Sequence, residues 1–221
     1  MDATIKYAGH DVTFYDVNPN DFIGKRLLNG DWYELQNLQY IRDLNVRGNY
    51  VDIGSYIGTH AIYFAKFCKA DKVFAFEPTP DIYNRLVHNL LRNTKGNWSA
   101  YNLGISNDSS RGVTRGSDTN KGASWIFPGN DFDVVTLDSI DLPPIKLMKI
   151  DVEGMELKVL QGAVCTLKDV EHLFIELWTK QQAKDNGAPY TKDNVIRFVD
   201  ALGFKLQKEM SEECLYHFQR R

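Results

Sequence analysis

The sequence predicts an α/β fold with a mostly parallel sheet and helices on both of its faces. Short apolar runs alternate with segments whose apolar residues recur at helical spacing, which is the order of βαβ units. Three of these runs end in acidic residues: Asp52, Glu77 and Asp151. Because the carboxyl ends of parallel strands meet at one edge of an open sheet, we expect these acids to line one cleft.

The N-terminal residues predict an accessory unit in front of the sheet. Residues 5–7 and 12–15 alternate around residues 8–11, which indicates a β-hairpin. Asp31 is a candidate cap for a helix over residues 32–44. We expect one domain over residues 1–221, in which residues 1–45 are the accessory hairpin and helix and residues 46–221 the catalytic sheet.

Residues 49–60 predict a strand, a tight turn and the start of a helix. Gly54 allows backbone geometry that a Cβ would forbid, and Gly58 lets the helix begin close to the strand or a ligand. The free N–H groups of that first turn would face a bound molecule. The predicted cofactor contacts here are Asp52, Gly54, Ser55, Tyr56, Gly58 and Thr59.

The next apolar run, residues 72–76, ends in Glu77-Pro78. A carboxylate at the end of the second strand of a βαβ unit can accept hydrogen bonds from both ribose hydroxyls, so Glu77 indicates a nucleoside cofactor and Pro78 lies beside it. The spacing Asp52-x-Gly54-x-x-x-Gly58 departs from the dinucleotide pattern, and Asp52 would repel phosphates. S-adenosylmethionine, with its sulfonium, ammonium and adenosine, fits both halves.

The middle of the chain predicts a helix, a strand and a long polar insertion. Thr79-Pro80 begins a helix that continues to Gly96, and residues 98–105 indicate a third strand. At the end of that strand Asn102, Leu103 and Gly104 are expected beside the adenine. Residues 106–131 are polar and fit either a functional lid or a mobile loop, with a small hairpin inside it.

The last third of the chain predicts the central strand and the end of the sheet. Residues 145–150 form a buried strand that delivers Asp151 and Glu153 to the predicted cleft, where Asp151 is also a predicted cofactor contact. Residues 155–161 are expected to form a helix. Residues 172–178 add a strand containing Glu176. Thr191 begins a helix, and residues 204–206 and 214–218 are expected to close the sheet as an antiparallel pair.

The amino-acid composition limits the kinds of binding partner and cellular location that we expect. The formal net charge of −3 and the pI near 6.0 give no broad basic field, so a nucleic-acid partner is not expected. Three distant cysteines predict neither a disulfide framework nor a zinc site. A basic and then apolar leader and a membrane-length apolar run are both missing from the sequence, so we expect a cytoplasmic protein with a small-molecule or glycan acceptor. The oligomeric state is left open.

The ordered motifs resemble the FkbM family of S-adenosylmethionine-dependent methyltransferases. The resemblance rests on Val51-Asp52-Ile53-Gly54-x-x-Ile57-Gly58, Phe76-Glu77-Pro78, Thr136-Leu137-Asp138 and Lys149-Ile150-Asp151-Val152-Glu153-Gly154-Met155-Glu156. It implies a seven-stranded class I methyltransferase sheet (Rossmann-like) and methylation of a hydroxyl on a sugar, glycan or glycosylated natural product. Ser55-Tyr56 departs from the family's usual Ala-Asn.

Methyl transfer to a hydroxyl predicts a nearby base. Asp151 is the first candidate and Glu153 the second, while Glu153 as a cap of the following helix is an equal alternative. His60 and His172 are further base candidates. A divalent metal is not expected, although Asp151, Glu153, Glu176 and Asp138 form an alternative set of oxygen ligands. N- or carboxyl-methylation and a catalytically silent cofactor-binding module also stay open.

Overall fold

A computed structural model of the chain describes residues 1–117, 120–185, 187–210 and 214–221.

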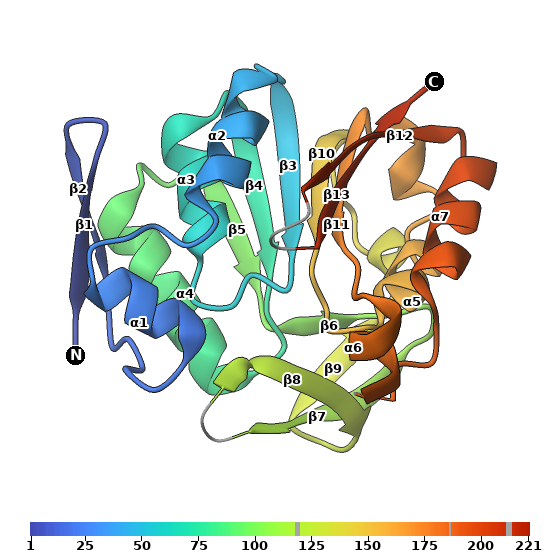
Figure 1. The fold of residues 1–221 in the computed structure, drawn as a ribbon, viewed down its shortest axis with the longest axis horizontal. Coiled ribbons are helices and arrows are strands. Elements are labelled where there is room, and N and C mark those ends of the chain that lie inside the picture. Colours follow the sequence, from blue (N-terminus) through green and yellow to red (C-terminus); the bar gives the residue numbers. More distant parts are fainter. Residues whose placement is uncertain (118–119, 186, 211–213) are drawn as a thin grey trace.

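The central sheet has seven strands in the order β12-β13-β11-β10-β3-β4-β5 (Figure 1). β13 runs antiparallel to both of its neighbours, and the other strands run parallel to one another. Their bounds are Gly48–Ile53 for β3, Ala70–Phe76 for β4, Trp98–Tyr101 for β5, Ile145–Ile150 for β10, His172–Glu176 for β11, Phe204–Met210 for β12 and Leu215–Arg220 for β13. The predicted mostly parallel sheet and its closing antiparallel pair are confirmed.

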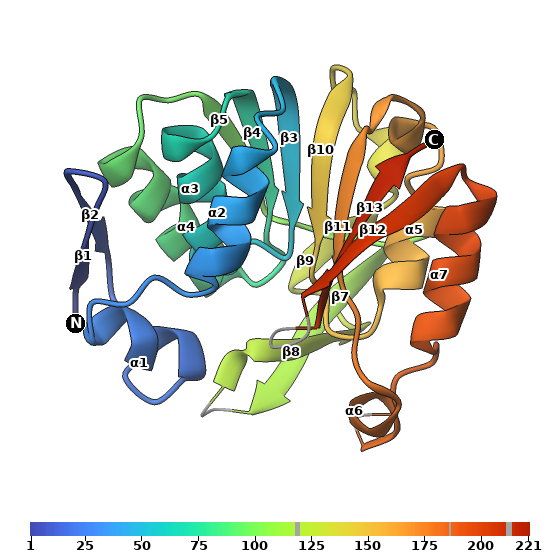
Figure 2. The same cartoon turned by 45° about the horizontal axis from the view of Figure 1, so that its top comes forward.

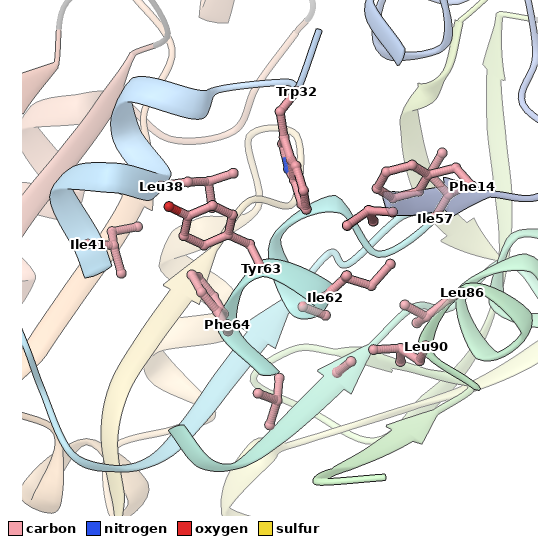
Figure 3. Packing of buried hydrophobic residues seen from close by; sticks show 14 of the residues in the cluster. Phe14, Trp32, Leu38, Ile41, Ile57, Ile62, Tyr63, Phe64, Leu86 and Leu90 are labelled. Carbon is pink, nitrogen blue, oxygen red and sulfur yellow. The ribbon is translucent and has the colours of Figure 1, made fainter. Parts of the chain in front are cut away.

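Helices cover both faces of this sheet, as the sequence predicts. Two hydrophobic clusters alternate along the strands, so that Tyr50 belongs to one cluster and Val51 to the other. The Tyr50 face packs against α2, α3 and α4, and the Val51 face against α5 and α7 (Figures 1 and 3). These helices are Leu35–Asp43, Thr59–Phe67, Pro80–Asn93, Glu156–Gln161 and Lys192–Ala201 in that order, with α6 at Lys180–Asp185 and short 3₁₀ helices at Leu137–Ser139 and Thr166–Asp169.

A second sheet corrects the prediction for the middle of the chain. The expected third strand divides at Asn102, because β5 ends at Tyr101 and Leu103–Ile105 forms β6 in a separate sheet of order β6-β9-β7-β8. The polar insertion forms the predicted hairpin, with Ser110–Ser117 as β7 and Asn120–Pro128 as β8, followed by β9 at Phe132–Val135. In Figure 1 this sheet lies below the carboxyl ends of β3 and β4.

The N-terminal segment contains the predicted hairpin and one helix more than predicted. β1 (Ala3–Tyr7) and β2 (His10–Phe14) form the hairpin, and Phe22–Leu28 forms an unpredicted helix, α1. α2 begins at Leu35 with Glu34 as its N-cap, so Asp31 is not the cap. Trp32 explains the difference: it is 4% exposed and packs edge-on against Tyr63, which fixes this stretch by tertiary contact rather than as helix. The segment lies beside α3 and α4, away from α5 and α7 (Figure 2).

Candidate active site

The turn after β3 has a left-handed backbone at three positions. Gly54, Tyr56 and Gly58 have φ of 82°, 48° and 94°. A Cβ on Gly54 would lie 1.8 Å from the carbonyl oxygen of Asp151, so glycine is needed for the close approach of β3 and β10 as well as for its φ. The N–H groups of Gly54 and Ser55 donate to the Phe76 carbonyl, which holds the turn over the end of β4.

Glu77 lies under this turn with its carboxylate buried. Its Oε2 accepts from the Tyr56 N–H at 3.1 Å and its Oε1 from the Thr79 N–H at 2.8 Å. Burial outweighs these hydrogen bonds and raises the Glu77 pKa to about 7. The Thr79 side chain also donates to this carboxylate. Since a carboxylate has about four lone-pair sites, acceptor capacity remains for a ligand hydroxyl.

The other predicted cofactor residues divide between the turn and its supports. The Ser55 hydroxyl donates to the Asp52 carbonyl, and Thr59 is buried at the first position of α3. Asn102 donates to the carbonyls of Glu77 and Pro78, so its amide holds the loop after β4. Leu103 and Gly104 belong to β6, where a Cβ on Gly104 would approach Ile126 and Val134.

A buried lysine lies at the carboxyl end of β10. Lys149 is the register partner of Asp52 on β3, and its Nζ donates to Asp151 Oδ2 at 2.9 Å. Burial lowers the Lys149 pKa, but the charges of Asp151, Asp52 and Glu34 outweigh burial and raise it, so the amine stays charged. Both Asp52 carboxylate oxygens are buried without a hydrogen-bond partner among the described residues.

Two further carboxylates lie around Asp151. Glu153 adopts a left-handed φ of 54°, a strained conformation for a non-glycine residue that often marks functional sites. Burial, and then the charge of Asp151, raises the Glu153 pKa to about 8. Burial and the Asp151 charge likewise raise the Glu176 pKa well above its usual range. Asp151, Glu153 and Glu176, together with Lys149, are called the carboxylate cluster below.

The geometry contradicts two alternatives raised from the sequence: Glu153 as a helix cap, and the acids as a set of metal ligands. The N-cap residue of α5 is Met155, with no side-chain cap, and the Gly154 N–H donates to Glu156, so Glu153 does not cap this helix. Asp138 lies elsewhere, where it accepts from the N–H groups of Cys165 and Thr166. Within the described ranges no three His, Cys, Asp or Glu side chains are placed to hold a metal ion, so Asp151, Glu153, Glu176 and Asp138 do not form the alternative ligand set.

The N-terminal segment reaches the carboxylate cluster through Tyr33 and Glu34. The Tyr33 hydroxyl forms a hydrogen bond with Glu34. Its pKa is raised, first by burial and then by nearby charges that include Glu176 and Asp151. Glu34 lies 2.9 Å from His60 Nε2 in a buried pair that lacks hydrogen-bond geometry.

The sequence alone assigns no role to Lys149, Tyr33 or Glu34. Lys149 did carry a signal, because a lysine inside a buried central strand needs a charged partner. Tyr33 and Glu34 carried none, since only the path of the N-terminal segment brings them to the site. The base candidate His60 is paired with Glu34, and His172 lies at the start of β11, away from the carboxyl edge.

The arrangement of strands and helices is the class I methyltransferase fold. The chain belongs to the methyltransferase FkbM domain family, whose sequence profile matches residues 52–206. The family resemblance predicted from sequence is confirmed.

Relatives of known sequence or structure agree with this assignment. AglP of Haloferax volcanii, a hexuronic acid methyltransferase, is 34% identical over 145 residues, covering 61% of this chain and 57% of AglP. The chain thus spans little more than half of that relative. The solved structure of an FkbM methyltransferase from Methylobacillus flagellatus shares the fold with a TM-score of 0.57 at 17% identity, covering 81% of this chain and 46% of that one. The yhhF methyltransferase of Escherichia coli matches 99% of this chain and 98% of its own, with a TM-score of 0.53 at 13% identity.

In the part of the chain that the structure describes, no helix has the length and apolar character that crossing a membrane requires.

Proposed function

We propose that the chain transfers a methyl group from S-adenosylmethionine to a hydroxyl of a sugar, a glycan or a glycosylated natural product. The observation that carries this proposal is the juxtaposition at one sheet edge. Glu77, the carboxylate proposed to bind the ribose, lies beside the strained turn that follows β3. The carboxylate cluster lies at the carboxyl end of β10, the neighbour of β3.

The residues present fit the cofactor. The remaining acceptor capacity of the Glu77 carboxylate suits a ribose hydroxyl, and the unpartnered oxygens of Asp52 suit a cationic group. Asn102, Leu103 and Gly104 are proposed neighbours of the adenine. When bound, S-adenosylmethionine supplies an electrophilic methyl group on a sulfonium, and the protein must hold the acceptor oxygen in line behind it.

Within the carboxylate cluster, different residues are proposed to act as the base and as hydrogen-bond donors. Asp151 lies beside the charged amine of Lys149, and we assign it the proton of the acceptor hydroxyl. Glu153, whose pKa is raised to about 8, is protonated near neutral pH and can donate a hydrogen bond to a neighbouring acceptor oxygen. Burial and the charge of Asp151 raise the pKa of Glu176 in the same direction. A polyhydroxylated acceptor provides both kinds of partner.

The acceptor class is proposed from this polarity and from the relative. AglP is named for methylation of a hexuronic acid, and an acidic sugar or a glycan containing one is therefore the first acceptor to test. A formal net charge of −3 supports a small acceptor over nucleic acid.

Replacing Glu77 tests the cofactor site. We expect Glu77→Ala to bind S-adenosylhomocysteine at least about tenfold more weakly than wild type in calorimetry, because hydrogen bonds to a charged group are lost. Asp81→Ala, at an exposed position in the first turn of α4, is the matched control and should bind normally. Equal affinity of Glu77→Ala and wild type, both folded, would show that the ribose assignment is wrong.

The raised pKa of Glu153 predicts how kcat/KM depends on pH on the alkaline side. Because its pKa is raised to about 8, the donor form predominates below that pH and is lost above it. We therefore expect kcat/KM to fall as the pH rises through about 8. Glu153→Gln keeps an N–H donor and should remove that fall; activity that instead rises through this range would assign the base role to Glu153.

A further inference from the structure

The turn between β3 and α3, residues 54–58, contacts the N-terminal segment at Tyr56. The Tyr56 hydroxyl donates to Asp21 Oδ2 at 2.6 Å, and Asp21 is only 2% exposed. The other carboxylate oxygen of Asp21 accepts from the Gly24 N–H and caps α1. One buried acid therefore joins the start of α1 to the middle of the cofactor turn.

A second contact reaches the turn at Ile57. The amide of Asn89 on α4 donates to the Ile57 carbonyl at 2.8 Å and accepts from the Tyr15 N–H at 2.7 Å. Asn89 is fully buried. Figure 3 shows Phe14 and Trp32, both from the N-terminal segment, on the same side of the cluster as Ile57. Polar and apolar contacts thus hold the turn from one direction.

A third contact reaches the first turn of α3. Glu34 and His60 form the buried pair described above, with their side chains 1% and 4% exposed. Glu34 itself has a left-handed φ of 55°. Glu34, which has this strained backbone, thus contacts α3 at His60, two residues after Gly58.

Tyr56 shows why the turn needs these contacts. Its left-handed φ of 48° is unfavourable for an aromatic residue, and such a conformation persists only where the surroundings hold it. Its N–H is also the donor to Glu77 Oε2, so a change in the Tyr56 backbone would move the proposed ribose-binding group.

We propose that residues 15–34 clamp the cofactor turn in its binding conformation, with Asp21 and Glu34 as positioning residues that act through Tyr56 and His60. This rests on the proposed function, because the ligand of the turn is taken to be S-adenosylmethionine. The matched family region begins at residue 52, so the clamp acts from outside it. A protein whose competent conformation is only partly populated binds with an affinity reduced by that fraction, and loosening the clamp therefore weakens binding.

Three variants at Tyr56 and a control test the clamp by S-adenosylhomocysteine calorimetry and thermal unfolding. Tyr56→Phe removes the hydroxyl and keeps the ring, and we expect its affinity to fall about tenfold, as for one lost charge-assisted hydrogen bond. Tyr56→Asn also loses the ring, but asparagine tolerates the left-handed region. It should bind more tightly than Tyr56→Phe although it unfolds at a lower temperature. Tyr56→Ala has neither the aromatic ring nor the tolerance of asparagine for the left-handed region, so it should bind most weakly.

The opposite order of affinity and stability separates positioning from simple structural support. Thr4→Ala, which removes an exposed hydrogen bond to Thr13 in the same N-terminal hairpin, should bind as wild type does. If Tyr56→Phe binds as wild type does, or if Tyr56→Asn binds no better than Tyr56→Phe, the clamp is overturned while the proposed function stands. If wild type itself does not bind S-adenosylhomocysteine, both are overturned.

Hydrogen exchange gives an independent readout through thermodynamic reciprocity. If the clamp favours cofactor binding, the cofactor must favour the closed clamp by the same factor. Saturating S-adenosylhomocysteine should slow amide exchange in residues 20–34 of wild type, and less so in Glu34→Gln. Exchange there that is unchanged on binding contradicts the proposal.

Discussion

Asp151→Asn is expected to lower kcat for methyl transfer by about 10²–10⁴-fold, the range that general base catalysis contributes. The variant keeps the shape of the side chain and an oxygen that accepts from Lys149 Nζ, so cofactor affinity should change little. The measurement is the initial rate at saturating donor and acceptor, paired with calorimetry of S-adenosylhomocysteine.

The control for this variant lies in the loop that leads into the same strand. Asp141 is exposed, and the variant Asp141→Asn should keep the wild-type rate. If Asp151→Asn folds, binds the cofactor and turns over at the wild-type rate, Asp151 is not the base. A loss of cofactor binding would instead place its main role in binding.

Lys149→Met is expected to lower the free energy of unfolding by about 3–5 kcal/mol, because it leaves buried carboxylates without their cation. The Lys149 side chain is 2% exposed and lies beside Asp52, which is fully buried, and Asp151, whose side chain is 23% exposed. Urea unfolding measured at neutral pH gives the difference directly.

The same strand provides a matched comparison. Lys146 pairs with Glu171 at 2.7 Å, but both side chains are exposed, at 36% and 52%. Lys146→Met should therefore cost only about 0–1 kcal/mol. Equal effects of the two substitutions would mean that Lys149 does not compensate the buried acids.

The sequence predicts the framework of the site because that part depends on local patterns. Gly54 and Gly58 mark a turn that only certain backbones can make, and the acids at strand ends follow from the geometry of a parallel sheet. The sheet order then places Asp52 beside Lys149 and brings Asp151 against the turn at Gly54.

What the sequence does not predict depends on contacts between distant segments. Nothing near Tyr56 indicates that its hydroxyl reaches Asp21, thirty-five residues away in the chain. The same holds for Glu34, which lies far from His60 in sequence and replaces Asp31 as the residue before α2. The expected continuous third strand failed for a similar reason, because the Asn102 amide is used to hold the loop after β4.

The central claim is methyl transfer from S-adenosylmethionine to a sugar hydroxyl, and mass spectrometry of the acceptor tests it most directly. The purified chain would be incubated with S-adenosylmethionine carrying a deuterated methyl group and with acceptors of each class: uronic acids, glycans that contain them, neutral sugars, amines and simple carboxylic acids. We predict one labelled methyl group on a hydroxyl of the sugar acceptors, with loss of the product in Asp151→Asn. Label on amines or carboxylates alone, or cofactor binding without any labelled product, would contradict the account.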